Sequence, residues 1–303
     1  MNFFSIFKRS QNSAKEQNPY NYTGSRYVDN VKIPKGFTEI GKNSFSGCRS
    51  LVSITIPRSI TKIGENAFLE CVSLAEIVIP NSVSEIGSHA FSNCISLTSI
   101  TIPDSVIKIC AGAFSYCSSL TDIIISNNAV EIDEDAFENC KSLTNITIPN
   151  GITKVSSGIL RECSSLTSIT IPSGVTEIGE NAFSFCSSLT SITIPNSVTE
   201  IGENAFSFCS SLTSITIPNS ISIIKYHSFS FCSSLTNITI PDSVTEIGEG
   251  AFIKCLSLVN IVIPKSVTKI CIDAFRECKS INNIEIPISV KEIGNFAFSE
   301  CSS

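Results

Sequence analysis

A cysteine recurs at every twenty-third residue along most of this 303-residue chain. A fixed period over such a length means that one small unit of secondary structure is stacked on copies of itself. Each unit then packs on its neighbours, and no single globular core is expected. The twelve cysteines that keep the period are Cys48, Cys71, Cys94, Cys117, Cys140, Cys163, Cys186, Cys209, Cys232, Cys255, Cys278 and Cys301.

Other residue types keep the same period and define the repeat. Eleven prolines and eleven phenylalanines recur in phase, with Ser126 and Leu160 as the replacements in these two columns. The consensus is I-P-x-x-V-x-x-I-G-x-x-A-F-x-x-C-x-x-L-x-x-I-x, and twelve units of 23 residues account for residues 28–303. We predict a repeat domain over 28–303 and, before it, a flexible polar leader over 1–27 that cannot bury enough apolar surface to fold.

Two patterns of apolar spacing lie within each repeat. The apolar residues from Ala205 to Leu212 are spaced as on the inward face of a short helical turn. Ile215 and Ile217 then alternate with polar residues, as in a half-buried strand, which Pro218 ends because proline donates no ladder hydrogen bond. An apolar pair three residues apart predicts a second short extended segment. The expected fold is α/β, a solenoid of short parallel strands with a short helical turn per repeat.

The sequence does not indicate that the glycine position of the I-G pair strictly requires glycine. Other residues replace it in five of the twelve repeats. A position that needed positive φ would hold glycine more strictly. We therefore expect ordinary backbone angles there.

The periodic cysteines lie beside phenylalanine and leucine columns, which favours buried free thiols over disulfides. Cys110 and Cys271 lie outside this period, so we expect them to be the more exposed thiols. No C-x-x-C or C-x-x-H spacing occurs, so the sequence predicts neither a zinc site nor a cofactor.

Charge and hydropathy exclude several classes of function. The formal net charge is -6 and no basic face is apparent, which argues against a nucleic-acid partner. No apolar run approaches the roughly 20 residues of a transmembrane helix. The first residues place apolar side chains before the positive charges, the wrong order for a secretory signal.

These residues and their spacing resemble the BspA-like leucine-rich repeat family, whose units carry the same 23-residue pattern. The resemblance covers residues 28–303. It implies a right-handed solenoid that binds proteins, with members described as surface antigens and adhesins that attach to host or matrix proteins. It implies no catalytic residues. The family also includes intracellular members.

Two features depart from the surface members of that family. We expect neither an export signal nor an anchor, which favours a cytoplasmic location, whereas the resemblance favours the cell surface. The sequence also stops at Cys301, Ser302 and Ser303, before the strand that should follow. Because solenoids need a polar cap at each end, this suggests a fragment, a short gene product or end-to-end self-association through the last repeat.

Outward strand positions form two rows, on the face where leucine-rich repeats usually bind partners. One row is rich in serine and asparagine and the other in threonine, which favours strands for its own reasons. A structural ladder therefore explains most of the second row, and departures within a row are the better guide to a binding site. They select Asp122, Ile124, Asn145, Asn237, Asn260 and Glu285.

Two further clusters break the repeat. Lys225, Tyr226 and His227 stand together in the ninth repeat, and an amphipathic aromatic beside a cation is typical of interface hot spots, although drift of a solvent loop gives the same pattern. The fifth repeat concentrates acidic residues without the order of a calcium loop, so a solvated acidic turn is the expected state. These residues are Glu131, Asp133, Glu134, Asp135 and Glu138.

Catalysis finds no support in the sequence. The two histidines, His89 and His227, occupy variable positions, and no nucleophile motif such as G-x-S-x-G occurs. We predict a noncatalytic protein-binding repeat protein that acts in surface recognition or adhesion. The alternative is an intracellular scaffold or regulatory subunit with the same fold.

Overall fold

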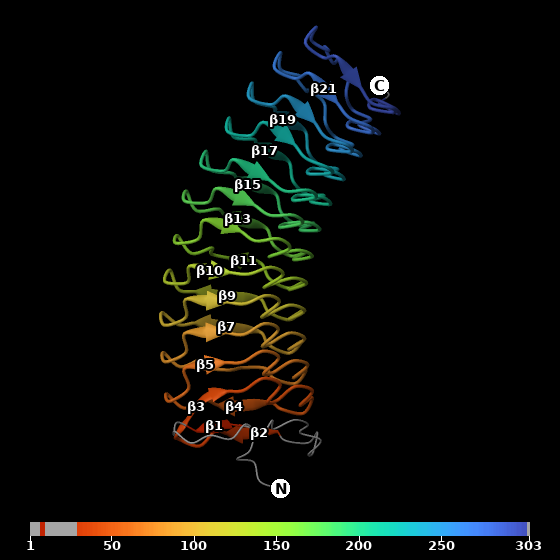
Figure 1. Cartoon of the computed structure of the whole chain (residues 1–303). Helices are drawn as coiled ribbons and strands as arrows, with labels where there is room; N and C mark the ends of the chain where they lie inside the picture. The colour runs from red at the N-terminus through yellow and green to blue at the C-terminus, as the bar shows by residue number, and fades with distance from the viewer. Residues whose placement is uncertain (1–6, 10–28, 302–303) are drawn as a thin grey trace. The chain divides into compact units, whose positions relative to one another are not determined.

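The computed structural model describes residues 7–9 and 29–301, which form strands and turns. They belong to two compact units, Met1–Gly151 and Ile152–Ser303, and the same repeat builds both. Within each unit one coil follows the next, and successive coils place their strands side by side (Figure 1).

The unit Met1–Gly151 carries sheets in the strand orders β1-β3-β5-β6-β8-β10, β11-β9-β7 and β2-β4. Apart from β1, neighbouring strands are parallel, and paired residues lie one repeat apart, as Ile86 and Ile109 do. The strands are β1 (Phe7–Arg9), β2 (Asn30–Lys32), β3 (Phe37–Ile40), β4 (Ser53–Thr55), β5 (Lys62–Ile63), β6 (Glu85–Ile86), β7 (Ser99–Ile102), β8 (Lys108–Ile109), β9 (Asp122–Ile125), β10 (Glu131–Ile132) and β11 (Asn145–Ile146).

The unit Ile152–Ser303 repeats this arrangement, with sheets in the orders β12-β14-β16, β13-β15-β17-β19 and β18-β20-β21-β22. All of its strand pairs are parallel and in register. The strands are β12 (Lys154–Val155), β13 (Ser168–Thr170), β14 (Glu177–Ile178), β15 (Ser191–Thr193), β16 (Glu200–Ile201), β17 (Ser214–Thr216), β18 (Ile223–Ile224), β19 (Asn237–Thr239), β20 (Glu246–Ile247), β21 (Lys269–Ile270) and β22 (Glu292–Ile293). Both predicted extended segments are thus confirmed.

Strand β1 comes from the predicted leader. Its backbone pairs antiparallel with β3, and Phe7 lies opposite Ile40. The rest of the leader lies outside the described residues, so the division between a leader over 1–27 and a repeat domain over 28–303 stays a prediction.

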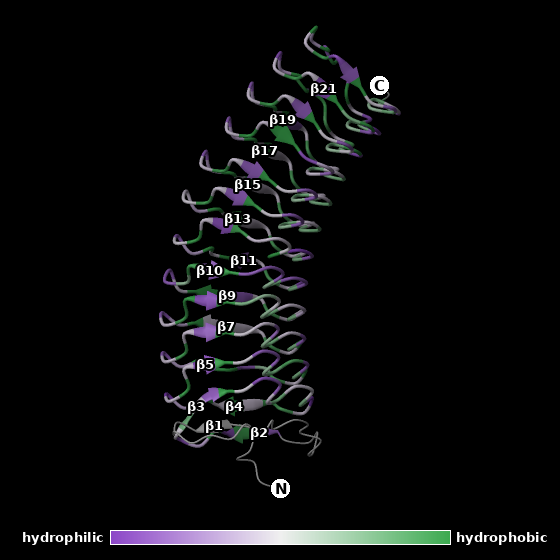
Figure 2. Ribbon diagram, in the orientation of Figure 1, coloured by the Kyte–Doolittle hydropathy of each residue, from purple (hydrophilic) through white to green (hydrophobic). Residues whose placement is uncertain are grey.

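Inward-facing side chains form columns along each unit, while polar residues interrupt the apolar ones along every coil (Figure 2). The ring of Phe206 is fully buried, with its centroid 5.3 Å from that of Phe183 and 5.5 Å from that of Phe229. The rings are nearly parallel, at 11° and 4°. One coil supplies one member of each column, so each side chain is buried by the coils above and below.

The predicted helical turn is wrong: the described residues contain no helix. The inward face was predicted correctly, but its backbone bonds elsewhere. The Phe206 amide donates to the Ser228 carbonyl of the next repeat at 2.9 Å, instead of to a carbonyl one helical turn back. On either side, Asn204 and Phe208 have φ of 54° and 60°, in the left-handed region where a right-handed helix cannot continue.

Apart from Gly36, the residues with positive φ occupy two columns, one five residues before each periodic cysteine and one directly before it. The first column is rich in residues that tolerate this conformation. Its members are Asn43, Asn66, His89, Gly112, Asp135, Gly158, Asn181, Asn204, His227, Gly250, Asp273 and Phe296. The second is chemically mixed and consists of Gly47, Glu70, Asn93, Tyr116, Asn139, Glu162, Phe185, Phe208, Phe231, Lys254, Glu277 and Glu300.

The glycine of the I-G pair lies outside both columns. Gly202 does not have positive φ, as expected from the sequence. A Cβ atom there would lie 2.5 Å from the Glu180 nitrogen of the preceding repeat. This glycine therefore permits close approach of two coils and serves no turn.

Replacing Asn204 with alanine should lower the free energy of unfolding by about 1–2 kcal/mol, because alanine resists the left-handed conformation. Asn204→Gly should cost less, because glycine adopts that conformation freely. Urea denaturation of both variants measures the difference. Equal losses in the two variants would show that the side chain of Asn204, and not its backbone angle, matters.

Candidate binding surface

The three-residue strands of the second unit present two rows of side chains outward. In β13, β15, β17 and β19 the central isoleucine is buried and the residues on both sides of it are exposed. Because neighbouring strands pair in register, equivalent residues align, as Ser191 with Ser214 and Thr193 with Thr216. Adjacent strands lie about 4.8 Å apart, so the rows form a closely spaced array of neutral polar side chains.

Three predicted binding residues lie together in the first unit. Asp122 and Ile124 are both exposed on β9, and Asn145 on β11 pairs beside Asp122. Ile124 is 57% exposed and lies beside Thr101 of β7. The surface therefore combines a carboxylate, an amide and an apolar side chain on adjacent strands.

The other three row residues lie in the second unit. Asn237, Asn260 and Asn283 form a continuous parallel ladder through backbone bridges. Asn260 and the predicted Glu285 line one hollow, together with Asn283, Val262, Ile288 and Lys291. Val262 is 78% exposed, so an apolar side chain again lies among polar ones.

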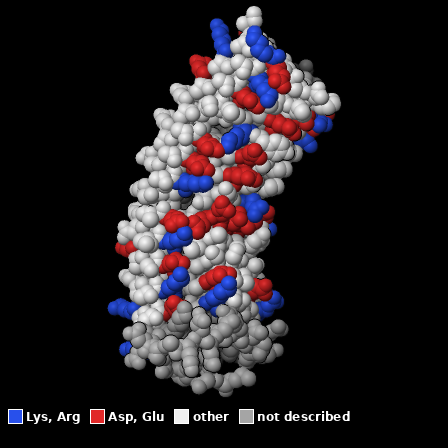
Figure 3. Space-filling model, viewed as in Figure 1, with Lys and Arg blue, Asp and Glu red and all other residues white. Residues whose placement is uncertain are grey.

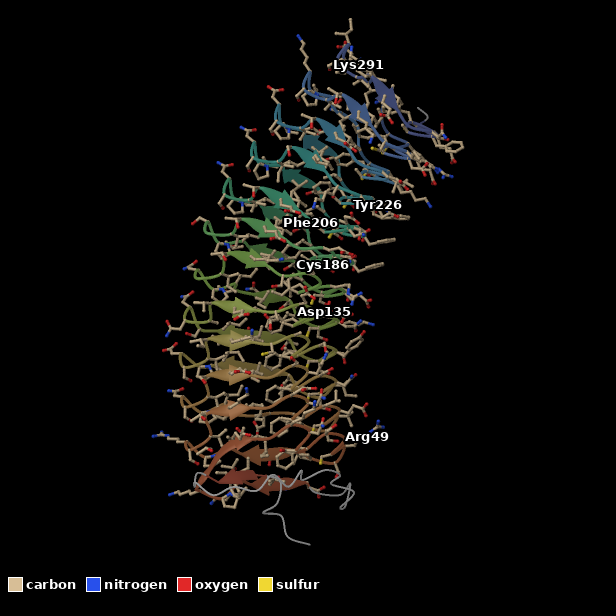
Figure 4. The ribbon with its side chains drawn as sticks, viewed as in Figure 1. Arg49, Asp135, Cys186, Phe206, Tyr226 and Lys291 are labelled. Atoms are coloured by element: carbon tan, nitrogen blue, oxygen red, sulfur yellow. The ribbon has the colours of Figure 1, made fainter. Side chains whose placement is uncertain are left out.

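The cluster of Lys225, Tyr226 and His227 does not join these rows. It follows β18, which belongs to a different sheet from β19 and Asn237. Lys225 bonds to Glu200, and the Tyr226 and His227 rings lie with centroids 4.1 Å apart and are tilted by 30° to each other. Burial lowers the pKa of His227. In Figure 4, Cys186, Phe206 and Tyr226 lie on three successive coils.

Several ion pairs of the described residues join neighbouring two-residue strands. Lys154 Nζ lies 2.8 Å from Glu177 Oε1, and Lys269 Nζ lies 3.1 Å from Glu246 Oε1 on the adjacent strand. Figure 3 looks onto this side, where cations and anions alternate. Cations and anions of this side thus pair with one another, whereas the rows on the three-residue strands carry neutral side chains.

Two of the acidic residues of the fifth repeat form ion pairs with Lys108. Glu131 Oε1 lies 2.6 Å and Asp133 Oδ2 lies 3.5 Å from Nζ of Lys108. Among the described residues no group of His, Cys, Asp or Glu side chains is arranged to hold a metal ion.

The thiols of the periodic column are buried, except for the partly exposed Cys301. The Cys209 Sγ donates to the Phe183 carbonyl at 3.2 Å, and equivalent bonds recur along the column. The expectation that Cys110 is exposed is wrong, because its side chain is only 8% accessible. Cys271 is partly exposed, as expected, and donates to Glu246 at 3.2 Å. Burial first, and then Glu246, raise the pKa of Cys271 to about 11.

A group of aromatic residues was missed from the sequence. Phe185, Phe208 and Phe231 each precede a periodic cysteine, and their rings stack along the surface with centroids 4.2 Å apart. We call these three residues the aromatic ridge. The three F-C pairs in consecutive repeats are visible in the sequence, but no local pattern there shows that these rings point outward.

No helix in residues 7–9 or 29–301 could cross a membrane. No match was found among curated proteins. A family model described as BspA type leucine-rich repeat region matches residues 15–143, 107–233 and 201–303.

Solved structures agree with this match. A leucine-rich repeat protein from Bacteroides ovatus is 30% identical over 96% of this chain and 92% of its own, with a TM-score of 0.67. A leucine-rich cell surface protein from Faecalibacterium prausnitzii is 31% identical over 87% and 88%, with a TM-score of 0.54. A leucine-rich repeat protein from Eubacterium ventriosum is 25% identical over 90% and 82%, with a TM-score of 0.62. The chain belongs to the BspA type leucine-rich repeat family.

Proposed function

We propose that the chain is a noncatalytic protein-binding protein that recognises its partner through the outward rows formed by β7, β9 and β11 in one unit and by β13, β15, β17 and β19, with the bridged residues Asn260 and Asn283, in the other. The observation that carries this proposal is the exposure of isolated apolar residues within polar rows, at Ile124 and Val262. Apolar anchors surrounded by polar groups are the usual composition of a protein-binding patch. Asp122, Asn145, Asn237, Asn260 and Glu285 would supply the polar contacts.

We further propose that the partner is an extracellular protein and that recognition takes place at the cell surface. The support is the likeness to a protein described as a cell surface protein, which is 31% identical. Reagents that cannot enter cells should label the chain on intact cells. Labelling only after lysis would favour the intracellular scaffold instead.

The binding surface can be tested with one matched pair of variants. Ile124→Glu places a charge in the outward row, where Glu285 shows that a carboxylate is tolerated. Binding is measured on a panel of immobilised matrix proteins. For the panel member that the wild-type chain binds best, we expect Ile124→Glu to weaken the affinity by about tenfold or more. Ile107→Glu is the control, because Ile107 is similarly exposed, at 53% against 57% for Ile124, and lies outside the outward rows.

Surface plasmon resonance on the panel measures both variants. Equal losses for Ile124→Glu and Ile107→Glu would place recognition elsewhere. If the wild-type chain binds no member of the panel, the proposed matrix-adhesion role is wrong.

End-to-end association through the last repeat, predicted from the sequence, stays a prediction. The last described repeat exposes Ile288, Ile293 and Phe296, with Ile288 at 95%. An Ile288→Glu variant serves as its test in the oligomerisation experiment below.

A further inference from the structure

The aromatic ridge is an exposed apolar feature of the second unit that the proposed binding rows do not use. Its three rings stack nearly parallel, at 6° between Phe185 and Phe208 and 12° between Phe208 and Phe231. Phe185 is 43% exposed and the other two are half-buried. All three belong to the unit Ile152–Ser303.

Each ring is attached to a backbone position that disfavours it. The φ angles of Phe185, Phe208 and Phe231 are 61°, 60° and 58°, in a conformation that costs a residue other than glycine about 1–2 kcal/mol. Asparagine, which tolerates this conformation better, occupies the same column at Asn93 and Asn139. Folding of the repeat therefore does not require phenylalanine here, and three consecutive strained, partly exposed rings point to a contact surface.

The stacking determines which part of each ring a partner can reach. Centroids 4.2 Å apart bring the rings almost face to face, closer than the 5.3 and 5.5 Å of the buried Phe206 stack. At one end, Lys254 Nζ lies 5.0 Å from the Phe231 centroid and covers its outer side. The exposed part is a narrow ridge of ring edges, which suits an apolar protein surface better than a flat ligand.

The residues beside the ridge leave it accessible. The neighbouring column holds the small side chains of Ser187, Ser210 and Ser233. Their hydroxyls donate to carbonyls of the preceding repeat, at 3.4, 3.3 and 3.3 Å. No long charged side chain of that column has to move when a second surface approaches.

The order of charges along this column identifies the occupant. Glu162 precedes the ridge and Lys254, whose Nζ also lies 3.6 Å from Glu277 Oε1 of the next repeat, follows it, so these five positions read anion, three rings, cation. A two-fold axis through Phe208 superposes this order on its own reverse. In two antiparallel copies, Phe208 meets Phe208, Phe185 meets Phe231, and Glu162 meets Lys254 at both ends.

We propose that the aromatic ridge binds the ridge of a second copy of this chain, as the contact of a symmetric antiparallel homodimer. Equal ring spacing in the two copies keeps all three ring contacts in register. Three partly exposed rings form a small interface, so the dimer exchanges with monomer and becomes populated as the concentration rises.

Sedimentation velocity over a concentration series tests the dimer. The wild-type chain should shift from monomer toward dimer, and Phe208→Asn should remain monomeric with an unchanged circular dichroism spectrum. Glu162→Lys or Lys254→Glu alone should weaken the dimer by about tenfold, and the double reversal should restore it. Ile288→Glu should leave it unchanged.

Cysteine cross-linking tests the symmetry, because a residue on a two-fold axis meets its own copy. Under mild oxidation Ser210→Cys, which lies beside Phe208 in the same coil and keeps all three rings, should form a covalent dimer, whereas the wild-type chain and Ser118→Cys, which changes the same column outside the ridge, should not. The proposal is overturned if the wild-type chain stays monomeric throughout. It is equally overturned if Phe208→Asn dimerises like the wild-type chain, or if Ile288→Glu abolishes the dimer and Phe208→Asn does not.

Discussion

The protein should unfold at about pH 10, because its buried thiols are protonated in the folded state and ionised in the unfolded chain. Burial raises the pKa of Cys117, Cys186 and Cys232 to about 12, against an ordinary value of 9.0. Burial also raises the pKa of further thiols well above 9.0, and these are Cys71, Cys94, Cys209, Cys255 and Cys278. Their stabilising effect is complete below pH 9 and is lost as the pH rises from there.

The effect is large because the thiols act together. Each one costs about 1.4 kcal/mol per pH unit above the unfolded pKa. At one unit above it, the thiols with strongly raised pKa together remove about 10 kcal/mol, which is comparable to the whole stability of a typical domain. Alkaline sensitivity is therefore a property of the repeated cysteine and not of any one site.

Urea unfolding in the presence of a reductant, from about pH 8 to about pH 10, measures the dependence. Cys209→Ala should reduce the slope of the unfolding free energy against pH by the contribution of one thiol, about 1.4 kcal/mol per pH unit. The two proteins differ only at residue 209, so the difference in slope isolates the thiol. A stability that stays level over this range would contradict the prediction.

Phe206→Ala should lower the free energy of unfolding by about 3–5 kcal/mol, because it leaves a cavity in a closely packed column. The ring of Phe206 is fully buried between the rings of Phe183 and Phe229. Both neighbours lose a stacking partner, and the backbone bonds between coils limit how far the cavity can collapse. Urea denaturation of the variant and the wild-type chain measures the loss.

The matched control lies two residues away. Phe208→Asn removes a ring that is half-buried and relieves a left-handed phenylalanine, so its effect on monomer stability should be small. Both variants are compared at a concentration where the chain is monomeric. A loss for Phe208→Asn as large as that for Phe206→Ala would mean that the surface stack stabilises the coil as strongly as the core stack.

The strands and the core follow from periods within one repeat. Ile215 and Ile217 were predicted inward from a two-residue alternation, and both are buried. The helical turn was wrong because its apolar spacing reports which side chains face inward, not where the amides bond. The partner of the Phe206 amide is Ser228, in the next repeat, and a local pattern cannot reveal a bond over that distance.

The candidate surface was predictable in part for the same reason. Alternation correctly placed Asp122 and Ile124 on the outward face, and the fixed period aligned Asn145 beside them. Cys110 was misjudged because its column, usually glycine, lies where neighbouring coils approach closely. The aromatic ridge depends on left-handed backbone angles in a column of mixed composition, which carries no residue signature.

The identical register of every parallel pair also bears on how such a protein changes in length. Residues pair with partners one repeat away in both units, and the segment Thr176–Ser197 recurs letter for letter as Thr199–Ser220. Gain or loss of one whole repeat leaves all remaining pairs in phase, whereas loss of a single strand residue turns every later side chain of that strand to the opposite face. Recombination between copies can therefore lengthen or shorten the surface without a new packing solution.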